Sequence, residues 1–129
     1  MKNTIHILIL IFAMALTNCV QETHLKTVTF KVDMRQVENP SQVGIRGNFT
    51  DNPWNDTLIL MDDDADGVFE LTVEKKTAVN EIAFKFVNAY DQFELLDQNN
   101  RRIQFEYKPE TIVYEAVFNK PQGKQTSIK

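Results

Sequence analysis

The sequence predicts an all-β protein, a sandwich of seven or eight short antiparallel strands. Apolar and polar side chains alternate with a period of two in several segments between residues 27 and 118, as in strands with one face in water. Turn-forming residues separate these segments about every ten positions. No segment in this range has the 3.6-residue period of an amphipathic helix, and no internal repeat is present.

Eight segments are expected to form the strands. In 27–34, Val28, Phe30 and Val32 alternate with threonine and lysine, and in 68–75, Phe69 and Leu71 alternate with glutamate and threonine. The other strands are expected at 42–48, 57–61, 81–88, 93–96, 103–107 and 111–118. Segments 93–96 and 103–107 are expected to pair as a hairpin around the polar stretch 97–101.

The first 18 residues are expected to be a removable signal peptide. A short start with Lys2 precedes an apolar run from 5 to 16, which is too short to cross a bilayer comfortably. The run leads to Leu-Thr-Asn-Cys, which resembles a bacterial lipoprotein box, with Asn18 where Gly, Ala or Ser is usual. Cys19 is therefore expected to carry lipid, and the alternative is an unmodified free thiol.

Composition limits the partners and the chemistry. The chain has 14 basic and 18 acidic residues and a net charge of −4, which disfavours nucleic acid because binding to it depends on neutralising phosphates. The single cysteine permits no intramolecular disulfide. No histidine–cysteine metal cluster, glycine-rich phosphate loop or serine–histidine pair is evident. We expect no enzymatic activity and no cofactor.

These observations divide the chain into four parts. Residues 1–18 are the expected signal peptide, and 19–26 a lipidated tether. Residues 27–118 are the expected sandwich domain. Residues 119–129, which contain Pro, Gly, Gln, Lys and Ser, are expected to be a disordered tail.

One turn contains the only tryptophan of the chain. It follows Gly47 and reads NFTDNPWN over 48–55. Trp54 is expected either to cover the end of the core or to lie exposed as a platform for a ligand. Stacking on an indole suits a sugar, because one face of a glucose-like ring presents apolar C–H groups.

Four segments in order resemble the immunoglobulin-like starch- and glycogen-binding modules. They are TFKVDM at 29–34, VGIRGNF at 43–49 followed by Trp54, DADGVFE at 64–70, and FKFVN at 84–88 with its continuation at 93–101. The resemblance spans about 28 to 118 and covers carbohydrate-binding module families 20 and 48 and the glycogen-binding domain of the AMP-activated kinase. It implies an immunoglobulin-like sandwich that binds an α-glucan.

The resemblance also implies which residues contact sugar. Its two aromatic rings correspond to Trp54 and Phe93, and its lysine corresponds to Lys85, which could equally be an ordinary surface lysine. Tyr90 and Asn88 are further candidates for a second ring and a hydrogen-bonding group. The chain departs from the pattern in three respects: residues 52–53 are inserted before Trp54, a phenylalanine replaces the second tryptophan, and a sugar-binding asparagine near the last strand has no counterpart.

The acidic turn at 62–67 reads DDDADG and imitates the first half of an EF-hand loop. The twelfth position of such a loop would be Val73 instead of a bidentate glutamate, and no helices flank it. A solvated turn is therefore favoured over weak Ca²⁺ binding by Asp62, Asp64 and Asp66.

The sequence thus leads to two functional hypotheses. In the first, the chain is a non-catalytic lipoprotein of the bacterial cell envelope, anchored in the outer membrane, that binds starch or glycogen by aromatic stacking. In the second, the same scaffold has a structural or protein-interaction role without sugar binding. Both include membrane attachment through lipid, and neither involves nucleic acid.

Overall fold

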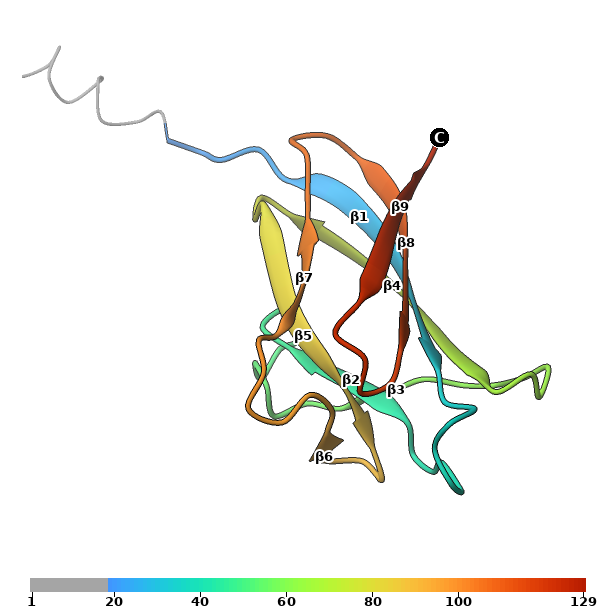
Figure 1. Cartoon of the computed structure of the whole chain (residues 1–129). Helices are drawn as coiled ribbons and strands as arrows, with labels where there is room; N and C mark the ends of the chain where they lie inside the picture. The colour runs from blue at the N-terminus through green and yellow to red at the C-terminus, as the bar shows by residue number, and fades with distance from the viewer. Residues whose placement is uncertain (1–18) are drawn as a thin grey trace, which may run out of the picture.

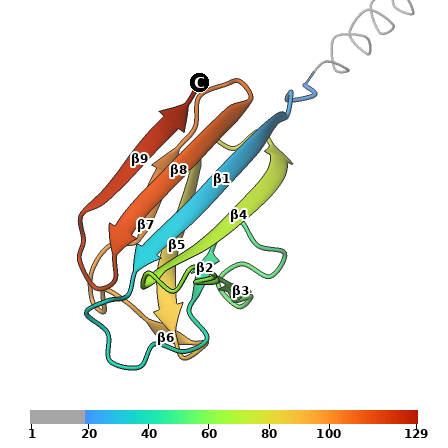
Figure 2. The same cartoon turned by 90° about the vertical axis from the view of Figure 1, so that its right-hand side faces the viewer.

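Two β-sheets packed face to face form the domain (Figures 1 and 2). The structure is a computed structural model that describes residues 19–129, so the expected signal peptide lies outside the described residues. One sheet has the strand order β4 (Val68–Thr77), β1 (His24–Asp33), β8 (Glu110–Val117) and β9 (Gly123–Ile128). The other has the order β3 (Leu58–Ile59), β2 (Gly44–Gly47), β5 (Glu81–Asn88) and β6 (Gln92–Phe93), and β7 (Arg101–Gln104) also pairs with β5.

The predicted all-β sandwich is confirmed. Residues 19–129 contain nine strands and no helix, and within this part of the chain no segment could cross a membrane as an apolar helix. One pairing differs from the expectation of antiparallel strands: β1 and β8 run parallel, with Lys26 opposite Glu110 and Asp33 opposite Val117. β1 begins at His24, inside the expected tether of 19–26, and is central in its sheet, between β4 and β8.

The core lies between the two sheets, where the alternation predicted it. Val28, Phe30 and Val32 of β1 point inward with at most 4% of their surface exposed. Phe84 of β5 packs edge-on against Phe30 and Tyr114, with ring centroids 5.1 and 5.0 Å away. Aromatic side chains from both sheets thus fill the centre, as a sandwich core requires.

Two local predictions are wrong. Residues 119–129 are not a disordered tail, because Gly123–Ile128 forms β9 and pairs with β8 in antiparallel register. All six residues of β9 are exposed, so it contributes backbone hydrogen bonds without the apolar alternation that would mark it in the sequence. Residues 93–96 and 103–107 do not pair as a hairpin either: β6 and β7 both pair with β5, one after the other along its length.

A buried ion pair joins the two sheets beyond the end of β8. The guanidinium of Arg101 donates to the Glu94 carboxylate from Nε at 2.6 Å and from Nη2 at 2.8 Å, and both side chains are 1% exposed or less. Arg101 also donates to the carbonyls of Val117 and Lys120. Glu94 accepts the N–H groups of Phe86 and Asn119. Burial alone would lower the pKa of Arg101, but its hydrogen bond to Glu94 raises it.

A second buried pair lies at the beginning of β8. Lys26 Nζ donates to Glu110 Oε2 at 2.6 Å and to the carbonyls of Glu106 and Lys108 at 2.7 and 2.6 Å. The two side chains are 3% and 4% exposed. Buried charges of this kind persist only when paired and hydrogen-bonded, and here all three N–H groups of the lysine have acceptors.

Substituting Arg101 by alanine should lower the free energy of unfolding by about 3–5 kcal/mol, because it leaves the Glu94 carboxylate buried and unpaired. The neighbouring Arg102 is the matched control: its side chain is 57% exposed and pairs with Glu81 at the surface. Arg102→Ala should cost less than about 1 kcal/mol. Urea denaturation of both variants provides the measurement, and an equal loss in the two would contradict the assigned role of the buried pair.

Candidate functional site

The predicted sugar-site residues surround an arginine on the outer face of the second sheet. Arg46 lies in β2 between Ile45, which is fully buried, and Gly47. Its cross-strand partner in β5 is Lys85. Because side chains alternate along a strand, Arg46 and Lys85 both point away from the core, side by side.

Two aromatic rings pack on the Arg46 guanidinium. Its central carbon lies 5.5 Å from the centroid of the Tyr90 ring and 5.6 Å from that of Phe93. Cation–π contacts of this kind contribute about 0.5–1 kcal/mol each at exposed sites. The arginine therefore holds Tyr90, in the turn after β5, next to Phe93 in β6.

Trp54 joins this group through its backbone. Its N–H donates to the Gly47 carbonyl at 2.9 Å, which closes the loop after β2, and its φ of 66° lies in the left-handed region. Arg46 Nη1 donates to the Trp54 carbonyl at 3.4 Å, a long bond. Arg46 Nε donates to Thr57 Oγ1 at 2.6 Å, and Thr57 in turn donates to the Tyr90 carbonyl at 2.9 Å.

We call Arg46, Trp54, Tyr90 and Phe93 the Arg46 cluster. Tyr90 is 47% exposed, while Trp54 and Phe93 are partly buried. The cluster thus consists of two rings packed on one cation and a third aromatic residue, Trp54, that the cation contacts through the backbone. Chemically, it offers ring faces and guanidinium N–H groups to a neutral polar ligand.

Lys85 and Asn88 lie beside the cluster but already have protein partners. Lys85 Nζ donates to the carbonyls of Leu95 at 2.7 Å and Gln98 at 3.0 Å, which fixes the turn after β6. The Asn88 side-chain oxygen accepts the Ser41 N–H at 3.1 Å. Lys85 therefore has one N–H group left for a ligand, and Asn88 has its amide nitrogen.

The sequence analysis did not single out Arg46. One signal was available: Arg46 is the only charged residue between Gln42 and Asp51, in a strand expected to alternate. Its aromatic partners come from a different part of the chain, and nothing in the local pattern of β2 predicts that contact.

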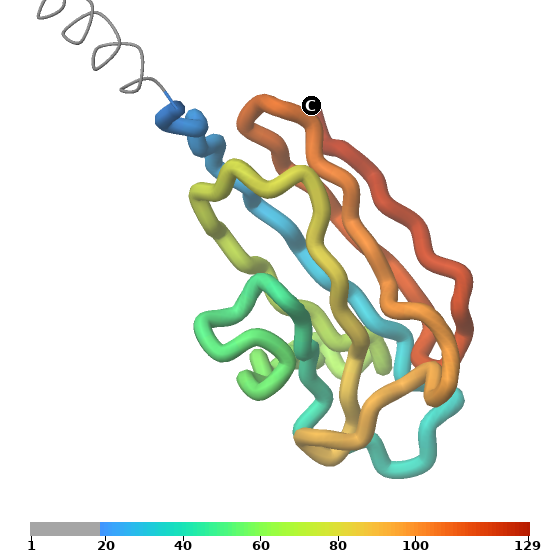
Figure 3. The backbone as a smooth tube through the Cα atoms, turned by 90° about the vertical axis from the view of Figure 1, so that its left-hand side faces the viewer, coloured from blue at the N-terminus to red at the C-terminus, as the bar shows by residue number. Residues whose placement is uncertain are grey.

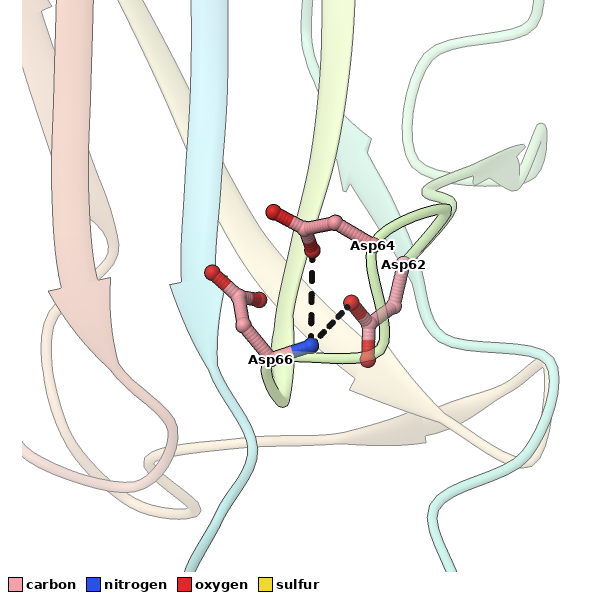
Figure 4. A group of neighbouring side chains, drawn as sticks. All are labelled: Asp62, Asp64 and Asp66. Carbon is pink, nitrogen blue, oxygen red and sulfur yellow. Dashed lines mark hydrogen bonds between the residues drawn. The ribbon is translucent and has the colours of Figure 1, made fainter.

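The acidic turn brings its three carboxylates together (Figure 4). Their oxygens lie within 4.8 Å of one another, but most already accept backbone N–H groups. Asp62 accepts from Asp66 and Gly67, and Asp64 also accepts from Asp66. The N–H of Val68 lowers the pKa of Asp66, whereas desolvation raises that of Asp64. This geometry serves the turn itself, and the Gly67 φ of 85° completes it.

Cys19, the expected lipidation site, is the first described residue and is exposed. It precedes β1, so a lipid on its sulfur would lie at the end of the domain where β1 begins (Figure 1).

Comparison with known proteins adds no family to these observations: no protein-family model and no curated protein matches the chain.

Asp62→Ala should lower the free energy of unfolding by about 1–2 kcal/mol, because the N–H of Gly67 loses its acceptor and that of Asp66 keeps only the Asp64 carboxylate. Asp63 is the matched control, since it is exposed in the same turn. Asp63→Ala should change the free energy of unfolding by no more than about 0.5 kcal/mol. Chemical denaturation distinguishes the two, and an unchanged midpoint for Asp62→Ala would show that its carboxylate does not support the turn.

Proposed function

We propose that this protein is a non-catalytic, lipid-anchored carbohydrate-binding module, and that an α-glucan such as starch or glycogen binds at the Arg46 cluster. The observation that carries the proposal is that Arg46 contacts the rings of Tyr90 and Phe93 and the backbone of Trp54. Three candidate residues, separated in the sequence, therefore lie around one group.

The chemistry of the cluster suits a neutral sugar. An aromatic ring covers the apolar C–H face of a glucose unit, and its hydroxyl groups need hydrogen-bonding partners. Thr57 and the Trp54 carbonyl accept two of the five N–H groups of Arg46. The remaining donors, with the free amide nitrogen of Asn88, can serve sugar hydroxyls beside the rings.

The free energy needed to bind a sugar requires contact with more than one ring. Covering about 60–100 Å² of one ring face contributes roughly 1.5–2.5 kcal/mol. A millimolar complex needs about 4 kcal/mol. Two rings, or one ring with two or three hydrogen bonds, reach this value, so the expected dissociation constant for a single cluster is about millimolar.

The alternative is a structural or protein-interaction role for the same scaffold. Two observations favour it. Lys85 Nζ already donates to two backbone carbonyls, and the Arg46 guanidinium already packs on the rings of Tyr90 and Phe93. In this alternative the aromatic residues stabilise the turns around β6, and no sugar is bound.

Tyr90→Ala should weaken maltoheptaose binding about tenfold, because about 1.4 kcal/mol of stacking corresponds to that factor. Tyr107 is the matched control: it is 63% exposed and packs on His24 at the start of β1. Tyr107→Ala should leave binding unchanged. Isothermal titration calorimetry with maltoheptaose and glycogen measures both, and absence of binding by the folded wild-type chain would favour the structural alternative.

Cys19→Ala should move the protein from the membrane fraction to the soluble fraction, because acyl chains contribute about 0.8 kcal/mol per buried methylene to membrane binding. Metabolic labelling with a radioactive or alkyne-bearing fatty acid gives an independent readout. Labelling that persists in the variant, or its continued sedimentation with membranes, would exclude Cys19 as the anchor.

A further inference from the structure

A cavity of about 140 Å³ lies between the two sheets, on the side of β4. Its walls are mainly apolar and come from both sheets: Val28 and Phe30 of β1, Val73 of β4, Ile82 of β5, and Phe49 and Phe105 from the loops after β2 and β7. Thr77 and Glu81 also line it, close to the turn between β4 and β5, which lies at the tether end of the domain (Figure 3).

The opposite side of the sandwich is closed. There the side chain of Gln125 in β9 accepts the Gln104 N–H at 3.1 Å and donates to the Gln104 carbonyl at 2.8 Å. These two bonds join the edge strands β9 and β7. On the β4 side, the contact between the sheets is different: Lys75 Nζ donates to the Phe49 carbonyl at 2.7 Å. The Phe49 ring lies flat on Phe30, with centroids 5.6 Å apart.

Two lysines also line the cavity. All three N–H groups of Lys26 are taken by Glu110 and two backbone carbonyls. Lys75, an exposed residue of β4, uses one of its three N–H groups for the Phe49 carbonyl. The apolar side chains of the wall, from β1, β4, β5 and the loops after β2 and β7, favour hydrocarbon. An engineered apolar cavity of about 150 Å³ stays dry and binds benzene, and the volume here is close to that value.

We propose that this cavity is a binding site for an uncharged hydrocarbon group of about six carbon atoms, which enters between β4 and Phe49. A polar substituent on the ligand would remain at the opening, beside Thr77 and Glu81. The site uses the inner faces of the sheets, whereas the Arg46 cluster is on the outer face of one sheet. The two sites are therefore separate, and hydrocarbon binding is independent of the proposed glycan binding.

The experiment is a titration of the methyl-labelled chain with toluene and with 1-hexanol, followed by NMR. Saturable shifts are expected for the methyl groups of Val28, Val73 and Ile82. Val113, partly buried on the outer face of β8, serves as the internal reference and should not shift. The two probes distinguish a ring from a chain.

Two variants test the location. Val73→Phe should fill the cavity and weaken toluene binding at least tenfold, while Val113→Phe, the same change on the outer face, should retain it. Phe49→Ala should widen the opening and shift the preference toward naphthalene, which keeps the test valid if Val73→Phe does not fold. The proposal is wrong if wild type shows no saturable shifts, if Val113 shifts equally, or if Phe49→Ala leaves the probe preference unchanged.

Discussion

The buried Arg101–Glu94 pair is the interaction on which the arrangement of the strands depends most. Its partners belong to β5, to the turn between β8 and β9, and to the segment between β6 and β7. These segments belong to both sheets. If any of them separated from the Arg101–Glu94 pair, a charge or a backbone group would be left unpaired in a buried environment. Such a pair contributes little net stability compared with a well-packed apolar substitute. It does, however, define one way in which the sheets can meet, because only this alignment satisfies both side chains.

At the other end of β8 the buried Lys26–Glu110 pair joins β8 to β1 within one sheet, so β8 has a buried ion pair near each end. Between them lies an aromatic core centred on Phe84. The sandwich is closed along β7 and β9 by Gln125 and less tightly along β4, where the cavity lies. Rigidity and accessible internal space are thus on opposite sides of the domain. The outer-face cluster around Arg46 is separate from both and depends on β2 and β5 for its position.

The amino-acid alternation predicted the long strands well, because residues such as Val28, Phe30 and Val32 face a core that only a period of two can fill. It could not predict β9: the residues GKQTSI bury no side chain, and their strand exists because β8 offers backbone partners. It could not predict the Arg101–Glu94 pair either, since Arg101 comes from a polar stretch typical of a surface turn and Glu94 is a single charged residue in the short expected strand 93–96. The candidate site was partly predictable. Trp54, Tyr90 and Phe93 were named from residue type and motif order. Arg46 was not, because its contacts with Tyr90 and Phe93 join residues 44 and 47 positions apart, which local patterns do not contain.

The parallel pairing of β1 with β8 also determines the order in which this protein can fold. Lys26 and Glu110 are 84 residues apart in the sequence, so the first strand lacks one of its two neighbours until nearly the whole chain has been synthesised. Contacts this distant in sequence carry a large loop-closure entropy and slow the folding of sandwich proteins to milliseconds or seconds. The emerging chain can form the β1–β4 and β2–β5 pairs, yet β1 keeps an open edge through most of synthesis.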